Sequence, residues 1–215
     1  MGFFIQKIVA AYSVLVSGIN IFHANTPDGG CFVLDARRLA GRHREKRNKK
    51  RGARLVTDLA IIVPVLKNEH LTEWFLSQLK AQTYKFFTCK VIDGSQSRSV
   101  AESWMKGVRE TTEPYLLFCN NDTVFATKDF LEKLVRIFKN NPACLSPISQ
   151  ETKVDPDLIG VTGHCFLVNR TLLDIIPFDI SFSPFYWEDV DFCWRLRKND
   201  CDPLITPDVS VIHFS

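Results

Sequence analysis

The sequence predicts an α/β domain in which helices flank a mostly parallel sheet, with an N-terminal extension before the domain. Two observations lead to this fold class. Between residues 59 and 139, continuous apolar runs alternate three times with segments of helical periodicity. The apolar runs lack polar interruptions, which is typical of strands buried on both faces of a parallel sheet. Right-handed crossovers are expected to connect such strands.

The predicted strands of the first half cover residues 59–65, 86–92 and 115–119. A helix opens at Asn68-Glu69 and ends at Gln82-Thr83, and two more are predicted over residues 97–110 and 128–139. The second half is less regular. Its predicted elements are a short strand at 145–149, a loop at 154–158, a strand at 160–169 that begins with glycines, an aromatic loop at 178–187, a helix at 188–197 and a β run that ends at His213.

Length and composition fit one soluble domain of residues 56–215. A chain of 215 residues can bury one core, and 46% hydrophobic and 24% charged residues are ordinary for a globular protein. The seven cysteines include no Cys-x-x-Cys pair, and most stand in apolar runs. We interpret them as reduced thiols in a cytosolic compartment, without a disulfide framework or a zinc site.

Residues 1–55 are interpreted as an apolar leader followed by a basic linker. The cleanest apolar part, residues 8–19, is shorter than the roughly 20 residues that span a bilayer. Residues 37–54 contain ten Lys or Arg and one acid, a local charge of +9 that leaves −6 for the rest of a chain with net charge +3. Positive charges after an apolar segment favour the cytoplasmic side. We expect a cytoplasmic protein, and the sequence leaves open disorder or a peripheral membrane contact of residues 1–55.

Short polar side chains follow two of the predicted strands. Asp93 follows the strand at 86–92, and Asn120, Asn121 and Asp122 follow the strand at 115–119. Ligands of open α/β sheets bind beyond the carboxyl ends of the strands, and a carboxylate flanked by amides suits a hard divalent cation. Each segment alone is more typical of a turn. Two carboxylates at neighbouring strand ends nevertheless favour a shared binding crevice.

Three acids open the predicted helix at 188–197. Carboxylates in a first turn stabilise a helix through its dipole, so Glu188, Asp189 and Asp191 have an ordinary structural explanation. Three acids after an aromatic loop exceed what that explanation needs, and one could act as a general base. His213 alone, at the end of a β run, indicates no function.

Four blocks in order resemble the inverting family-2 glycosyltransferases of the GT-A fold, a Rossmann-like fold, and in particular their rhamnosyltransferase-like members. The blocks are Ile61–Val65 with Asn68-Glu69 and Gln82–Tyr84, then Val91–Ser95, then Phe118–Thr123, then Gly163–Arg170 followed by Trp187–Arg195. The third block looks like a variant of the family's DXD metal motif, and the last like its catalytic Glu-Asp helix. The resemblance covers residues 59–213.

The resemblance implies transfer of a sugar from a UDP- or dTDP-sugar to a hydroxyl of a glycan or lipid-linked acceptor. Asp122 would bind Mn²⁺ or Mg²⁺, with His213 completing the metal shell. Asp189 would be the catalytic base, with Glu188 as the second candidate. The implied nucleotide-sugar contacts are Pro64, Val65, Asp93 at the base, Asn120, Asn121 at the ribose or diphosphate, and Gly163.

Three departures from the family pattern stand in the chain. Leu66 takes the place of an aromatic residue that often stacks on the base. The segment between Asp93 and the strand at 115–119 is shorter than usual, and relatives usually continue past Ser215 with helices that shape the acceptor site. A minimal or truncated catalytic domain is therefore expected.

Two other function classes remain as alternatives. One is a non-catalytic domain that binds sugar nucleotides or glycans, although the presence of both Asp122 and Asp189 argues against a decayed site. The other is nucleic-acid binding through residues 37–54. That segment lacks interleaved aromatic residues, so no specific nucleic-acid partner is expected.

Overall fold

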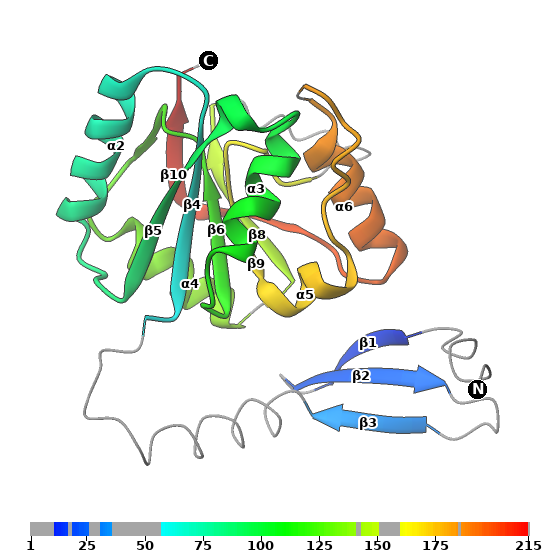
Figure 1. Ribbon diagram of the computed structural model, residues 1–215. Coiled ribbons are helices and arrows are strands. Elements are labelled where there is room, and N and C mark those ends of the chain that lie inside the picture. The colour runs from blue at the N-terminus through cyan, green and yellow to red at the C-terminus, as the bar shows by residue number, and fades with distance from the viewer. Residues whose placement is uncertain are drawn as a thin grey trace, which may run out of the picture. The chain divides into compact units, whose positions relative to one another are not determined.

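The structure is a computed structural model that describes residues 11–16, 19–25, 31–35, 57–140, 143–150, 160–184 and 186–214 (Figure 1). Its contacts divide the chain into two compact units, residues 1–55 with 199–201, and residues 56–198 with 202–215. In the first unit, β1 (Ala11–Val16), β2 (Ile19–Asn25) and β3 (Cys31–Asp35) form an antiparallel sheet. These three strands were not predicted from the sequence. No helix of the described residues is both long and apolar enough to cross a membrane.

The second unit contains a seven-stranded mixed sheet of order β5-β4-β6-β9-β8-β10-β7. Its strands are β4 (Leu59–Val65), β5 (Phe87–Asp93), β6 (Tyr115–Cys119), β7 (Thr123–Phe125), β8 (Cys144–Ser149), β9 (Cys165–Asn169) and β10 (Leu204–His213). The pairings make β5, β4, β6, β8 and β10 run in one direction, while β9 and β7 run in the other. The predicted α/β class with a mostly parallel sheet is confirmed.

Helices cover both faces of this sheet (Figure 1). They are α2 (Glu69–Ala81), the short 3₁₀ helix η1 (Gly94–Gln96), α3 (Val100–Arg109), α4 (Phe130–Asn140), α5 (Arg170–Ile175) and α6 (Glu188–Lys198). The predicted strands and helices of the first half are all present. The expected strand at 160–169 begins later, at Cys165, and β7 and α5 were not predicted. The predicted loop at 154–158 lies outside the described residues.

Side chains of β6 alternate between two hydrophobic cores, as the period of a strand requires. Leu117 and Cys119 pack into a cluster with Phe75 of α2 and with the apolar face of α4. Phe118 points to the other face, where its ring centroid lies 5.6 Å from that of Trp104 on α3. Five apolar α4 residues that recur at helical spacing, Phe130, Leu131, Leu134, Val135 and Phe138, are all buried. The central strand is therefore buried on both faces, as its uninterrupted apolar sequence predicts.

Helix α3 lies unusually close to the sheet at Gly107. A Cβ atom added there would be 2.4 Å from Ile62 Cγ2, and Ile62 is fully buried in β4. The glycine therefore permits an approach that a larger residue would block. Because α3 begins at Val100, this packing also sets the position of the chain segment at its N-terminus, which forms one wall of the cleft described next.

Candidate functional site

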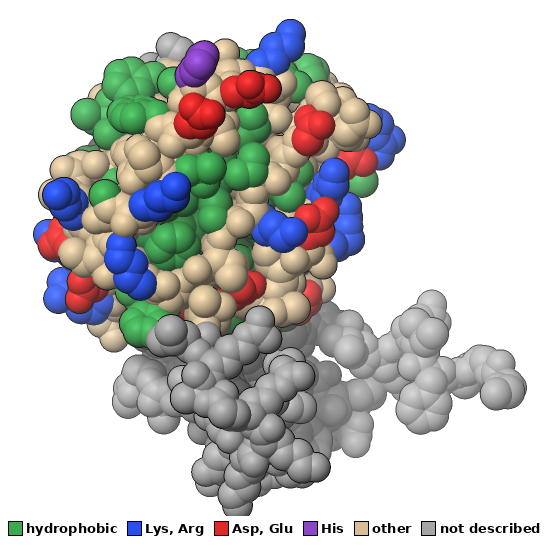
Figure 2. Space-filling view, turned by 60° about the vertical axis from the view of Figure 1, so that its left-hand side comes forward, with side chains coloured by type: hydrophobic (Ala, Val, Ile, Leu, Met, Phe, Trp, Pro, Cys, Tyr) green, Lys and Arg blue, Asp and Glu red, His purple; other side chains and the backbone are tan. Residues whose placement is uncertain are grey.

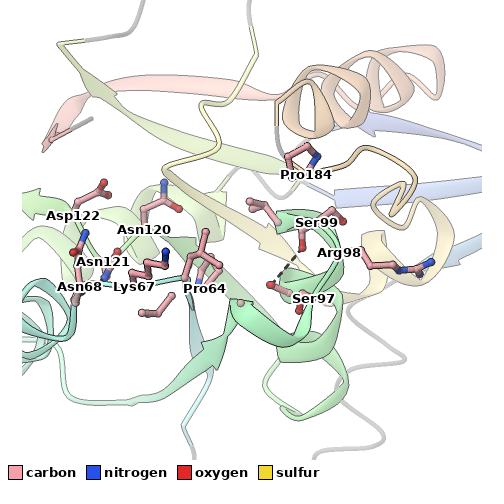
Figure 3. Close-up of a pocket in the computed structure, with 15 residues that line it drawn as sticks. Pro64, Lys67, Asn68, Ser97, Arg98, Ser99, Asn120, Asn121, Asp122 and Pro184 are labelled. Carbon is pink, nitrogen blue, oxygen red and sulfur yellow. Dashed lines mark hydrogen bonds between the residues drawn. The ribbon is translucent and has the colours of Figure 1, made fainter.

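A cleft of about 350 Å³ lies beyond the carboxyl ends of β4, β5 and β6 (Figure 3). This is where ligands bind in open α/β sheets. Its lining residues are Pro64, Val65, Leu66, Lys67, Asn68, Gly94, Ser97, Arg98, Ser99, Val100, Ser103, Asn120, Asn121, Asp122 and Pro184. Five residues predicted to bind donor or metal therefore line one cleft, namely Pro64, Val65, Asn120, Asn121 and Asp122.

The turn after β6 is tied to its surroundings on two sides. The Asn120 backbone N–H donates to the carbonyl of His164, with an N–O distance of 2.9 Å. On the other side, Asn121 Nδ2 donates to Thr72 Oγ1 of α2 at 3.0 Å. Asn68, just before α2, has a φ of 73° in the left-handed region, a conformation that asparagine tolerates better than most residues. Asn120 and Asn121 of this turn are thus held by hydrogen bonds to His164 on one side and to α2 on the other.

Asp122 lies beside His213, the last residue of β10. Asp122 Oδ1 is 3.1 Å from His213 Nε2, and the Phe214 N–H donates to the Asp122 carbonyl at 3.1 Å. The His213 ring stacks on that of His164, with 4.5 Å between centroids and 13° between planes. The fold therefore brings together the two residues that the family resemblance assigns to the metal.

The donor atoms at Asp122 fit a divalent cation. Asp122 Oδ1 is buried and, despite its distance to His213, has no hydrogen-bond partner of suitable geometry among the described residues. A buried carboxylate oxygen without a partner is unfavourable, and a cation would satisfy it. No group of three or more His, Cys, Asp or Glu suited to a metal occurs in the part of the chain that the structure describes. Asp122 and His213 would therefore share the ion with substrate phosphates and water, as is common for Mg²⁺.

Asp189 and Glu188 lie in the first turn of α6. Asp189 Oδ2 accepts the Gly163 N–H at 2.8 Å, and Oδ1 accepts the Val190 N–H at 2.9 Å. Burial raises the pKa of Asp189, although these backbone hydrogen bonds act in the opposite direction. Burial, with the charge of Asp189 as a smaller contribution, also raises the pKa of Glu188. Glu188 Oε2 is buried without a hydrogen-bond partner among the described residues. A carboxylate with a raised pKa is suited to accept a proton.

The segment Gly163-His164 joins these two groups of residues. The Gly163 N–H binds Asp189, while the His164 carbonyl accepts both the Asn120 N–H and the Thr123 hydroxyl, the latter at 3.2 Å. A Cβ atom at position 163 would be 3.2 Å from Asp189 Oδ2, so a larger residue there would crowd this carboxylate. One dipeptide therefore contacts both the turn that carries Asp122 and the helix that carries Asp189.

Asp93 does not line the cleft. Its exposed side chain accepts the Ser95 N–H at 2.9 Å and caps η1, and the hydrogen bonds from Ser95 lower the pKa of Asp93. Its neighbour Gly94 does line the cleft. Gly163, Glu188, Asp189 and His213 are also absent from the lining. His213 contacts the lining residue Asp122, and Gly163 and Asp189 are connected to the lining residue Asn120 through His164.

Several lining residues were not predicted from the sequence. Lys67 lies at the Asp122 end of the cleft, whereas Ser97, Ser99 and Pro184 lie at the other end (Figure 3). The Arg98 side chain extends away from Asp122 and pairs with Glu102, with 3.3 Å between Nη2 and Oε1 (Figure 3). The only sequence signal for Lys67 is its position two residues after a strand end. No feature of the sequence predicts that Pro184 lines the cleft, because its position depends on how the loop before α6 packs against residues that are distant in sequence.

Solved structures with the same fold are glycosyltransferases. The mannosyltransferase PcManGT from Pyrobaculum calidifontis, in complex with GDP-Man and Mn²⁺, has a TM-score of 0.62 and 15% identity, and the match covers 81% of this chain and 64% of that one. TarS from S. aureus has a TM-score of 0.56 and 12% identity, over 74% of this chain and 37% of its own. The chain thus spans less than two thirds of either neighbour. Both matches confirm the expected GT-A fold.

The family is shown by sequence. No curated protein matches the chain significantly. The family model described as Glycosyl transferase family 2, however, matches residues 67–190, which is more than half of the chain and includes Asn120, Asp122, Gly163 and Asp189. The chain belongs to glycosyl transferase family 2.

Proposed function

We propose that the protein transfers a glycosyl residue from a nucleoside-diphosphate sugar to an acceptor hydroxyl, with inversion at the anomeric carbon. One observation carries this proposal. The Gly163-His164 segment joins a metal-competent carboxylate, Asp122, to a second carboxylate with a raised pKa, Asp189, at the edge of a single cleft. Asp122 acts on the donor, through the cation, and Asp189 acts on the acceptor hydroxyl.

The cleft supports a nucleotide-sugar donor. Pro64, Val65 and the exposed Leu66 provide apolar surface for a base, and Asn121 and Lys67 lie at the end where a diphosphate would meet a cation (Figure 3). The structural neighbour PcManGT binds GDP-Man, whereas the sequence resemblance favours UDP- or dTDP-sugars and a rhamnosyltransferase-like donor. The identity of the donor's nucleobase is therefore the first variable to test.

Asp122 and His213 would hold Mn²⁺ or Mg²⁺. Such a cation neutralises charge on the leaving nucleoside diphosphate when it is bound. Support comes from the buried Asp122 Oδ1, which lacks a hydrogen bond of suitable geometry among the described residues, and from the Mn²⁺ complex of the neighbour.

Asp189 accepts the proton of the acceptor hydroxyl. Its two backbone hydrogen bonds fix the carboxylate, and its burial makes it a stronger base than an exposed aspartate. The deprotonated oxygen attacks the anomeric carbon from the face opposite the leaving diphosphate, which inverts the configuration. Glu188 is the alternative base.

The experiment that tests this function is a calorimetric titration of UDP, dTDP and GDP, with Mn²⁺ or with EDTA. We expect one nucleotide to bind only with metal, and Asp122→Ala to lose that binding. Sugar donors of the same base are then tested for transfer, and the anomeric configuration of the product is read by NMR. Metal-dependent binding without any turnover would favour a non-catalytic nucleotide-binding domain. No binding under either condition would contradict the proposal.

A further inference from the structure

Trp187 is exposed in a way that packing does not explain. Among the four tryptophans, Trp104 is buried in the aromatic core, Trp74 pairs with Phe214 at 6.2 Å between ring centroids, and Trp194 lies under Lys198 Nζ at 3.5 Å. The Trp187 side chain is 66% exposed, and the described residues give its indole neither a ring contact nor a hydrogen bond. Tyr186, next to it, is 71% exposed.

The backbone at these two residues is strained. Tyr186 has a φ of 82° and Trp187 a φ of 74°, both in the left-handed region that disfavours large side chains. The Trp187 carbonyl accepts the Asp191 N–H at 2.8 Å, so Trp187 precedes the first turn of α6 as a capping residue does. Ser, Thr, Asn, Asp and Gly are favoured there, and none of them is present. Neither helix capping nor core packing accounts for an aromatic pair at this place.

The chain just before the pair is fastened to the donor cleft. Ser183 Oγ donates to the Arg98 carbonyl at 2.7 Å, and the Val100 N–H donates to the Pro184 carbonyl at 3.3 Å. Pro184 also lines the cleft. The pair Tyr186-Trp187 therefore stands between a residue of the cleft wall and the carboxylates of Glu188 and Asp189.

The charge around the pair favours a neutral ligand. The first turn of α6 carries Glu188, Asp189 and Asp191. Within the described part of the chain, only Asp191 of these three forms an ion pair, with 2.7 Å between its Oδ2 and Arg195 Nη2. A phosphate or other anion would be repelled by these carboxylates. A pyranoside offers hydroxyl groups to carboxylates and a C–H face that can pack on an aromatic ring, and Trp and Tyr combine an apolar body with a polar tip.

We propose that Tyr186 and Trp187 form an acceptor subsite on which a neutral pyranoside ring stacks, so that one of its hydroxyl groups lies next to Asp189. This inference rests on the proposed function and assigns the acceptor class. The acceptor is glycan-like at its reacting end, whatever is attached farther away.

The test uses the full chain with the donor established by titration. Methyl glycosides of glucose, galactose, mannose, rhamnose and N-acetylglucosamine serve as acceptor probes, and decyl phosphate serves as the anionic comparison. Trp187→Gly removes the ring at a position whose backbone favours glycine, so its melting temperature should be no lower than that of the wild type. Trp187→Phe retains an aromatic face. Trp194→Ala is the matched control, because it removes a similarly exposed indole from α6, the helix that Trp187 precedes.

For the best glycoside probe, Trp187→Gly is expected to raise KM about tenfold, the loss of one aromatic contact, with a smaller change in kcat. Trp187→Phe should restore most of the affinity, and Trp194→Ala should match the wild type. An unchanged glycoside KM in Trp187→Gly would overturn the subsite, and so would transfer to decyl phosphate but to no glycoside. Nucleotide titration of the wild type tests the proposed function separately. If the wild type binds no nucleotide, the proposed function is contradicted before any acceptor is added.

Discussion

Burial and hydrogen bonding act on the Asp189 carboxyl in opposite directions. Burial raises its pKa above the ordinary value of 3.8, and the N–H groups of Gly163 and Val190 moderate the rise. The ionised form is therefore less favourable in the folded protein than in the unfolded chain. Because the base acts in its ionised form, transfer should fall as the pH drops through this raised pKa.

We expect Asp189→Asn to reduce turnover by about 10²- to 10⁴-fold, the usual contribution of a general base. Stability gives a second measurement. As pH rises from 3.8 through the raised pKa, the wild type loses stability relative to Asp189→Asn, because only the wild type ionises there. Urea denaturation of both proteins across this interval measures the difference. A gain of wild-type stability with rising pH would mean that the pKa is lowered instead.

Residues that directly follow a strand could be placed in the cleft from the sequence. Asn120, Asn121 and Asp122 follow an uninterrupted apolar strand, so the strand-end rule locates them, whereas Pro64 and Val65 were expected only from the family resemblance. Asp93 follows the same rule but turns to cap η1. Pro184 could not be predicted, because its contact with the cleft depends on hydrogen bonds to Arg98 and Val100, far away in sequence.

At the scale of elements, α3 can pack closely on β4 because Gly107 has no side chain. Ile62 Cγ2 and Cγ1 would be 2.4 and 3.1 Å from an added Cβ atom. Ile62 is fully buried and has little room to move. A displaced α3 would carry Ser99 and Val100 away from the cleft, so the helix–sheet distance also sets the cleft width.

Gly107→Ala is expected to destabilise the fold by up to about 2 kcal/mol, because overpacking costs about 1–3 kcal/mol and the gain in helix propensity offsets about 1 kcal/mol of that cost. In an Ile62→Ala background the obstruction is gone, and the same substitution should stabilise the protein by about 1 kcal/mol. Chemical denaturation of the four proteins of this double-mutant cycle gives both values. If Gly107→Ala changed the free energy of unfolding in the same direction in both backgrounds, Ile62 would not be the residue that obstructs a side chain at position 107.

The sequence predicted elements with strong periodicity and missed those that depend on distant pairing. β6 matches its apolar run, and the five inward residues of α4 follow helical spacing. β7 has three residues and pairs with β10, which follows it by some eighty positions, so no local pattern indicates it. The antiparallel direction of β9 depends on its pairing with β6 and β8, which periodicity alone does not specify.

At the scale of the whole molecule, all candidate site residues belong to the unit of residues 56–198 and 202–215. Lys, Arg, Asp and Glu side chains are interspersed with hydrophobic ones on the face shown in Figure 2, so no basic patch for nucleic acid stands out on that face. The strongest basic cluster of the sequence is the segment 37–54.

Deletion of residues 1–55 should therefore leave metal-dependent nucleotide binding within about twofold of the full chain, since none of the cleft residues is removed. Calorimetry of the two proteins provides the comparison, and circular dichroism checks that the shortened protein is folded. Nucleic-acid binding through residues 37–54 would instead disappear on deletion and would weaken steeply with salt in the full chain. Nucleotide binding lost from a folded deletion variant would place part of the donor site in residues 1–55.

The contact between the Asn120–Asp122 turn and His213 also has a consequence in time. Asn120 Nδ2 and His213 Nε2 are 3.4 Å apart in space but 93 residues apart in the chain. At synthesis rates of about 5–20 residues per second, β10 leaves the ribosome roughly 5–20 seconds after the turn. During that interval a growing polypeptide carries Asp122 without its imidazole neighbour and without the hydrogen bond from Phe214. A nascent chain is therefore unable to bring Asp122 and His213 together until β10 has been made.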